Sequence, residues 1–382
     1  MKIAPVLAGL LAAAAAHATG LDIRFYPSTL HTYPLASDRG LSSLVIQNTA
    51  FVNQDTRPIK ITSVAFEVLA NNNVAETRSL HADDLAKSIA AGQRVQGMLD
   101  LLDFQFGGEA LLPKGGKLAT STTLAPGEAL YVGSQVFALR GPRTEVRVIV
   151  VGSAGDALVT SAASVRVAGE SQNAYRLPVK GTWLVGAGPT LHSQHRWAVP
   201  EEFAFDLMKA GPDGVTHRGD GTHRTDYLAY GEPVFAAAQG KVVAAVNGEP
   251  ETDDDLQRPD ENPEAYLARV QATQMERLKR GVAAVAGNHV VIEHADNEYS
   301  LYAHLKPGSV EVKAGDRVAV GQRIGTVGTS GNSTEPHLHF QVGDGADPLH
   351  CAGIPIRFEN LSIRNADFPR PPQTGDFVSS SP

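Results

Sequence analysis

Cysteine is almost absent from this sequence, which contains a single one, Cys351, in 382 residues. A lone cysteine excludes an internal disulfide and a zinc cluster built on thiolates. Any metal bound by this chain must therefore be held by histidine and carboxylate side chains, with or without water.

Runs of basic residues and long apolar segments are also missing. The net charge is −8 and the isoelectric point is about 5.9, and no Lys/Arg run provides a positive field for phosphate backbones. This charge pattern argues against nucleic-acid binding. Beyond the N-terminus no stretch is long and apolar enough to span a bilayer, so we expect no integral membrane segment in the mature protein.

The first 18 residues have the pattern of a secretory signal peptide. Lys2 precedes an apolar stretch from Ile3 to Ala16 that is too short to span a bilayer, and Ala16-His17-Ala18 offers an A-x-A cleavage site. The alternative is a short membrane anchor, but no stop-transfer pattern follows. We therefore expect cleavage after Ala18 and an exported protein, either periplasmic or secreted.

The rest of the chain is long enough for two domains, and the first is predicted over residues 19–168. Short segments with alternating apolar and polar residues predict strands there. One segment, 82–92, has helical spacing instead, with Gly92 as its stop. An antiparallel, immunoglobulin-like β-sandwich without a catalytic cluster is the simplest interpretation. The clearest predicted strands are 43–47, 59–68, 128–132 and 145–151.

Residues 169–190 are punctuated by proline and glycine and predict a linker. Strand patterns resume in the second domain, expected over 191–367. An acidic and then helical segment at 249–286 interrupts them and predicts an insertion. Residues 368–382 are rich in Pro, Ser and Gly, which predicts a disordered tail.

His337 and His339 give the sharpest local signal for chemistry. They flank Leu338 in a predicted strand, where the period of two directs both imidazoles to one face. One imidazole can then bind a metal while the other handles a proton. Another strand histidine, His304, lies shortly upstream in the sequence YAHL.

Asp206 provides a candidate carboxylate ligand. It alternates with Phe205 and Leu207 in a predicted strand that has little other reason to carry a charge. The alternative is a solvated residue on an exposed face. A catalytic zinc needs three protein ligands and an open position for water, so the residues together indicate a histidine and carboxylate metal site.

Longer motifs resemble the lysostaphin/LytM zinc metallopeptidases. In chain order they are GEPVFAAAQGKVV at 231–243, GNHVVIEH at 287–294, YAHL at 302–305, a glycine-rich run at 312–333 and PHLHF at 336–340. The similarity covers about 191–358, without the insertions. It implies an antiparallel β metallopeptidase domain, a Zn²⁺ cofactor and hydrolysis of peptide bonds. Its implied substrates are peptidoglycan stem peptides or cross-links.

The same resemblance assigns roles to individual histidines. His339, the second histidine of the HLH pair, matches a zinc ligand of the family. His304 and His337 match its two catalytic histidines, which would orient and deprotonate the attacking water and stabilise the oxyanion.

The first histidine and the aspartate of the family's zinc site correspond here to His195 and Asp206. His192 remains an alternative to His195. Many members place these two ligands in H-x-x-x-D just before the G-x-P-V turn, where this chain has His223 and Asp226 with one residue fewer between them. That pair is rejected because its side chains would have opposite parity on a strand. Residues 207–230 are then an inserted loop.

Two functions other than peptidoglycan hydrolysis stay open. The chain could be a catalytically silent member of the family that binds cell wall or activates a separate hydrolase. It could also keep the zinc site and cut proteins or small peptides.

Overall fold

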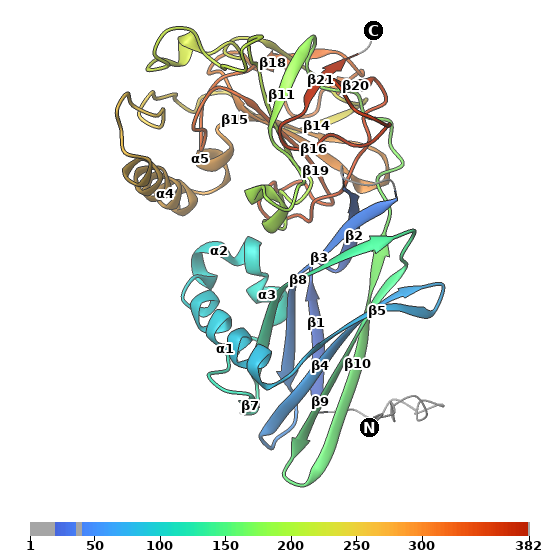
Figure 1. Ribbon diagram of the computed structural model, residues 1–382. Helices are drawn as coiled ribbons and strands as arrows, with labels where there is room; N and C mark the ends of the chain where they lie inside the picture. Colours follow the sequence, from blue (N-terminus) through green and yellow to red (C-terminus); the bar gives the residue numbers. More distant parts are fainter. Residues whose placement is uncertain (1–19, 36–39, 381–382) are drawn as a thin grey trace.

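The computed structural model describes residues 20–35 and 40–380, which form two β domains stacked end to end (Figure 1). The predicted signal peptide, 1–18, lies outside the described residues. Within the described ranges, no helix has both the length and the apolar content needed to cross a membrane. The predicted fold class is confirmed: the chain is mainly β, with an N-terminal β domain followed by a second, antiparallel β domain.

The N-terminal domain is a curled sheet whose two halves enclose a common core. Its strands are β1 (Leu21–Tyr26), β2 (Thr29–Pro34), β3 (Leu41–Asn53), β4 (Ile59–Ala70), β5 (Asn73–Leu80), β6 (Lys117–Leu118), β7 (Thr123–Leu124), β8 (Glu128–Arg140), β9 (Glu145–Ala154) and β10 (Ala157–Ala168). The order is β5-β4-β9-β10-β2-β3-β8-β6, with β1 on β3 and β7 on β4. Leu44 and Ile46 of β3 share one core with Val64 and Phe66 of β4, as expected when two sheet layers pack face to face.

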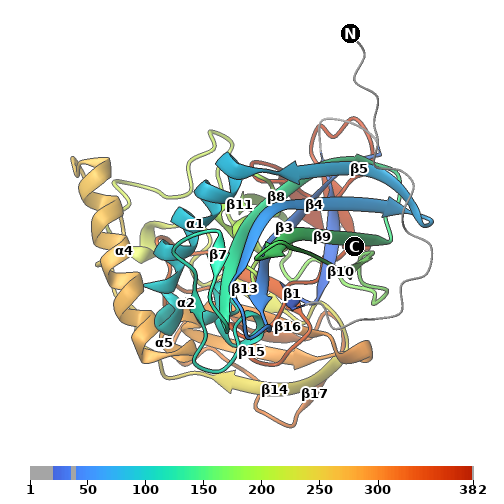
Figure 2. The same cartoon turned by 90° about the horizontal axis from the view of Figure 1, so that it is seen from below.

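Three helices lie together along one side of this sheet: α1 (Ala82–Gln96), α2 (Leu99–Phe106) and α3 (Gly108–Leu111) (Figures 1 and 2). The predicted stop at Gly92 is wrong, because α1 continues to a C-cap at Gly97. Gly92 is buried against Tyr131 of β8 and Leu118 of β6. Packing of the helix on the sheet outweighs the cost of about 1 kcal/mol for an internal glycine.

The C-terminal domain is built on a nine-stranded antiparallel sheet with the order β17-β14-β15-β16-β19-β12-β11-β21-β20, and β13 pairs with β18 beside it. The strands are β11 (Thr182–Ala187), β12 (Phe205–Met208), β13 (Pro233–Phe235), β14 (Gly240–Val246), β15 (Asn288–Glu293), β16 (Tyr299–Leu305), β17 (Arg317–Val318), β18 (Arg323–Thr326), β19 (Leu338–Gly343), β20 (Leu361–Ile363) and β21 (Phe377–Ser380). Three short 3₁₀ helices join them: η1 (Gln194–Trp197), η2 (Arg224–Asp226) and η3 (Ala295–Asn297).

The predicted insertion forms a separate arm that leaves the sheet between β14 and β15 (Figure 1). It carries α4 (Pro263–Arg280), whose N-terminus is capped by the side chain of Asn262, and the short α5 (Val282–Ala286). Within the arm, Arg277 of α4 pairs with the buried Asp255, which lies in the segment before the helix.

The predicted linker and disordered tail need correction. Within 169–190, the buried side chain of Tyr175 joins the C-terminal core and β11 pairs with β12, so this segment is part of the second domain. Within 368–382, β21 pairs with β11 and β20, and Val378 is buried in the same core. The composition of 368–382 alone predicts disorder. The backbone pairing of β21 and the buried side chain of Val378 nevertheless give part of this segment a regular structure.

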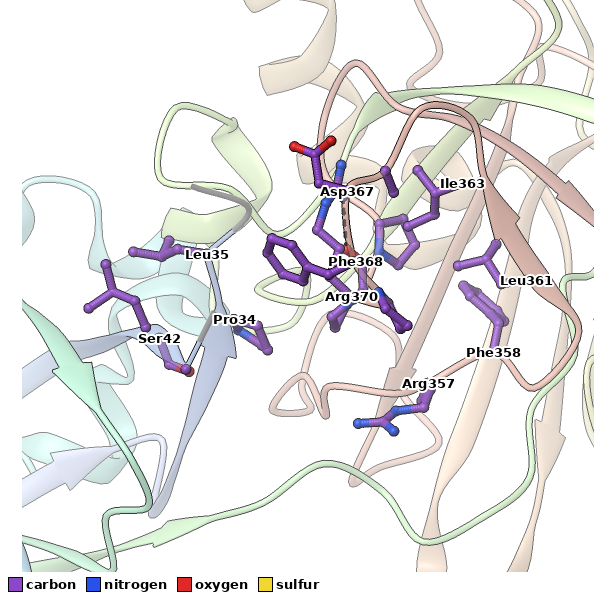
Figure 3. Close-up of a pocket in the computed structure, with 16 residues that line it drawn as sticks. Pro34, Leu35, Ser42, Arg357, Phe358, Leu361, Ile363, Asp367, Phe368 and Arg370 are labelled. Atoms are coloured by element: carbon purple, nitrogen blue, oxygen red, sulfur yellow. Dashed lines mark hydrogen bonds between the residues drawn. The ribbon is translucent and has the colours of Figure 1, made fainter. Parts of the chain in front are cut away.

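A cavity of about 880 Å³ lies between the two domains (Figure 3). Pro34, Leu35 and Ser42 line it from the N-terminal side, and a wall around Phe358 and Phe368 lines it from the other. None of its lining residues is a histidine, so it is separate from the candidate metal site described next.

Candidate metal centre

Three neighbouring strands bring the candidate side chains together at the centre of the C-terminal sheet. β19 lies between β16 and β12, and Asp206 of β12 pairs directly with His339 of β19. Side chains of directly paired residues lie close together on one face of a sheet. The Nδ1 atom of His339 is 2.9 Å from Oδ1 of Asp206. The alternating residues Leu338 and Phe340 face the core on the other side, as the HLH spacing predicts.

His304 reaches this face through an irregularity in β16. Regular alternation would place it on the same side as Tyr302, which is buried in the core. The pairing register between β15 and β16 shifts next to it, and His304 has a φ of +61°, in the left-handed region. Such a bulge redirects a side chain, and strained backbone of this kind gathers at functional sites. The His304 ring consequently lies 4.8 Å from that of His337 and 5.8 Å from that of His339, between ring centroids.

His195 lies outside the sheet, in η1. Its Nε2 atom is 3.3 Å from Oδ2 of Asp206, and its ring centroid is 5.2 Å from that of His339. One ligand atom from each of His195, Asp206 and His339 can be chosen so that all lie within 4.8 Å of one another. His192, the alternative, is exposed, and its ring lies 3.4 Å from the Thr190 hydroxyl.

The rejected pair lies elsewhere, at η2. The imidazole of His223 is mostly exposed and lies 3.6 Å from Asp253. Asp226 binds the backbone N–H of His223. Neither residue is among the three that converge at the candidate site.

Hydrogen bonds fix the protonated nitrogen in three of the four clustered imidazoles. Nδ1–H of His304 donates to the carbonyl of Ser330 at 2.9 Å, and Nδ1–H of His337 donates to the carbonyl of Glu335 at 2.7 Å. A carbonyl can only accept, so in the neutral forms both Nε2 atoms keep a free lone pair. Nε2–H of His339 donates to Oε1 of Gln341 at 2.9 Å, so Nδ1, which lies 2.9 Å from Oδ1 of Asp206, is the nitrogen available to a metal.

The sequence motifs did not reveal these outer partners. Gln341 carries a usable signal, because it follows His339 by two residues and therefore shares its face of β19. Ser330 and Glu335 contribute through their backbone carbonyls, and no side-chain pattern marks such a role.

The charges in the cluster are strongly coupled. Burial opposes ionisation of Asp206, but the imidazoles of His195 and His337 outweigh it and hold the pKa of Asp206 well below its usual value. Burial likewise disfavours a charged His339, yet the hydrogen bond that its Nδ1–H donates to Asp206 raises its pKa to about 9. His337 has a raised pKa because Asp206 again outweighs burial.

His304 behaves in the opposite way. Burial, reinforced by the nearby His337 and His339, places the pKa of His304 well below the usual value for histidine. His304 is therefore neutral near pH 7 with an unprotonated Nε2 atom, while Asp206 favours the protonated form of His337. Neighbouring groups with pKa values pushed apart are typical of acid–base sites.

The residues present fit a zinc ion. Asp206 is 8% exposed, and among the described residues only imidazoles, with no Lys or Arg, lie within ion-pair distance of its carboxylate. A buried carboxylate requires a compensating cation. Two imidazole nitrogens and one carboxylate oxygen are also the ligand set of many catalytic zinc sites.

Comparison with known proteins agrees with the motifs. Residues 268–350 match the family model described as Peptidase family M23. The peptidoglycan DD-endopeptidase ShyA of Vibrio cholerae is 41% identical over 73 residues, which are 19% of this chain and 16% of that protein. The DD-carboxypeptidase/endopeptidase Mpg of Neisseria meningitidis is 39% identical over 76 residues, which are 20% of this chain and 17% of that protein. The chain thus spans about a sixth of the length of the curated relatives it matches.

Two solved structures align with parts of this chain. The catalytic domain of lysostaphin from Staphylococcus simulans has 20% identity, covers 46% of this chain and 88% of its own, and has a TM-score of 0.24. A zinc containing peptidase from Vibrio cholerae has 13% identity, covers 87% of this chain and 83% of its own, and has a TM-score of 0.25. The family M23 match at 268–350 and the relatives named as peptidoglycan endopeptidases confirm the predicted resemblance.

The family match includes three of the five candidate residues, namely His304, His337 and His339. It begins inside α4, so His195 and Asp206 lie outside it. Their place in the site depends on the geometry described above.

Proposed function

We propose that the C-terminal domain is a zinc-dependent endopeptidase that hydrolyses peptide bonds in peptidoglycan. The observation that carries this proposal is the convergence of His195, Asp206 and His339 around one point, next to two further imidazoles. The names of the curated relatives support peptidoglycan stem peptides or cross-links as the substrate. Such a substrate also fits the predicted export, either to the periplasm or out of the cell as a secreted protein.

His195, Asp206 and His339 would hold the zinc ion. When bound, zinc supplies Lewis-acid chemistry: it polarises a peptide carbonyl and lowers the pKa of water. The protein's part is to keep three donor atoms in place, which β12 and β19 do for two of them through their paired backbones. The carboxylate of Asp206 remains ionised because its pKa is held low by the surrounding imidazoles, burial notwithstanding.

His304 and His337 would divide the proton and charge handling. His304 keeps its Nε2 lone pair free, and its lowered pKa, caused mainly by burial, keeps it neutral, so it can accept a proton from the attacking water. His337 has a protonated form favoured by Asp206 and can stabilise negative charge on the oxyanion. Both rings are oriented by backbone carbonyls, which avoids reorganisation during the reaction.

Digestion of purified peptidoglycan, with mass analysis of the released fragments, tests this proposal. The zinc-loaded wild type should release peptides cut at one type of bond, and the variants His304→Ala and His339→Ala should not. His223→Ala is the matched control, because this exposed histidine lies outside the cluster and its loss should leave the digest unchanged.

The outcomes separate the alternatives. Stoichiometric zinc without release of fragments from any peptidoglycan, protein or peptide substrate would favour a silent, cell-wall-binding protein. Cleavage of peptides but not of peptidoglycan would favour the zinc peptidase with a different substrate.

A further inference from the structure

The loop that carries His195 is held by the N-terminal domain. Gln47 of β3 donates from Nε2 to the backbone carbonyl of Arg196 at 2.9 Å. Gln105 of α2 donates from Nε2 to the backbone carbonyl of Trp197. Two glutamines from the other domain thus bind the two peptide carbonyls that directly follow His195.

These carbonyls lie at the end of a very short helix. η1 spans four residues, and its C-cap amide, that of Ala198, bonds back to the carbonyl of His195 at 3.0 Å. The last carbonyls of a helix have no partner within it and need one from elsewhere. Here the N-terminal domain supplies that partner, so the backbone conformation of η1 depends on contact between the domains.

The side chain of Arg196 strengthens the same contact. It is fully buried and pairs with Glu202, which is itself 4% exposed. Its Nη2 atom donates to the hydroxyl of Ser43 on β3 at 3.3 Å. The guanidinium lies 4.9 Å from the centre of the Phe203 ring, which contacts Tyr33 of β2. The residue after the candidate ligand is therefore fixed in the domain interface.

His195 is also the candidate ligand whose ring is least restrained. Asp206 and His339 belong to paired strands, and the His339 ring is further oriented by Gln341. His195 lies outside the sheet, and its buried Nδ1 atom has no hydrogen-bond partner among the described residues. Its orientation toward Asp206 therefore depends on the backbone of η1.

We propose that Gln47 and Gln105 are positioning residues for the metal centre. They hold η1 so that His195 completes the ligand set. The N-terminal β domain thereby helps to position a ligand of the zinc site. The inference rests on the proposed function, because it takes His195 to be a zinc ligand. It gives the N-terminal domain a role in the metal centre.

Zinc affinity of the full chain tests the proposal, measured by competition with a chromophoric chelator near neutral pH. Gln47→Met and Gln105→Met keep side-chain length but remove the amide donor. Each should raise the zinc dissociation constant roughly tenfold, the lower end of the range seen when outer partners of metal ligands are removed. The metal-free melting temperature should be recorded for every variant.

Gln93→Met is the matched control. Gln93 also donates to two backbone carbonyls, those of Leu118 and Ala119, but these contacts stay within the N-terminal domain. This variant should lower the melting temperature by a similar amount and leave the zinc dissociation constant unchanged within about twofold, since nothing it touches carries a ligand.

Unchanged zinc affinity in Gln47→Met and Gln105→Met would overturn the inference while leaving the proposed function intact. An equal loss in Gln93→Met would also overturn it, because the effect would then be general destabilisation. If Gln47→Met does not fold, the half-buried Gln105 decides the question alone. Absence of zinc binding by the wild type would instead remove the proposed function and this inference with it.

Discussion

Replacing Gln341 by leucine should weaken zinc binding without touching a ligand. Gln341 is 3% exposed, accepts the Nε2–H of His339 at 2.9 Å, and donates its own Nε2–H to the carbonyl of Pro348 at 3.2 Å. The second bond fixes which end of the amide faces His339. The change Gln341→Leu keeps a similar volume and leaves the imidazole N–H buried without an acceptor.

The size of the effect follows from that lost acceptor. An unsatisfied buried donor costs about 1–3 kcal/mol. Without Gln341 the proton on His339 is free to move to Nδ1, the atom that should bind the metal. A tenfold change in affinity corresponds to about 1.4 kcal/mol, so the zinc dissociation constant should rise roughly 10- to 100-fold.

Chelator competition on Gln341→Leu, alongside Gln373→Leu, provides the assay. Gln373 is 7% exposed and donates to the carbonyl of Pro34 at the domain interface, so it controls for the loss of a buried amide. Only the first variant should lose zinc affinity. Equal affinity in Gln341→Leu and the wild type would refute the reasoning that this hydrogen bond orients His339.

Three further predictions concern the protein's pH dependence, interface and ligand choice. Asp206 raises the pKa of His339 to about 9, although burial opposes this. In the unfolded chain the pKa of histidine is about 6.5, so the charged His339 stabilises the metal-free protein fully below that pH. This stabilisation is lost as the pH rises through about 9. Melting temperatures in chelator should therefore fall across that window and fall less in His339→Ala. Arg196→Met leaves Glu202 buried without its cation and should cost about 3–5 kcal/mol in chemical denaturation of the metal-free protein; a loss below about 1 kcal/mol, typical of an exposed pair, would contradict it. His192→Ala should retain stoichiometric zinc, because this exposed ring makes only a 3.4 Å contact to a threonine hydroxyl; metal loss would reverse the ligand choice.

Strand periodicity in the sequence predicted much of the candidate site. The alternation along each predicted strand placed His337 and His339 on one face, and Asp206 on the face opposite to its two core neighbours. The structure has these side chains on one side of β12 and β19. Periodicity works here because alternation along a paired strand is fixed by backbone geometry. The same rule fails for His304, which alternation assigns to the core and a bulge turns outward.

Sequence periodicity could not predict the features that depend on long-range contacts. His195 lies on a loop that is held by hydrogen bonds from Gln47 and Gln105, which belong to the other domain. The C-terminal segment has a loop-like composition, yet β21 is ordered by pairing with β11. In each case the deciding interaction joins residues far apart in the chain, which no local pattern records.

X-ray absorption at the zinc edge of the metal-loaded full chain tests the central claim most directly. We predict one zinc per chain with nitrogen and oxygen donors at about 2.0–2.2 Å, including two imidazoles, and no sulfur. In His195→Ala the imidazole count should fall to one. Absence of stoichiometric zinc, or a shell that keeps both imidazoles in that variant, would contradict a centre built from His195, Asp206 and His339.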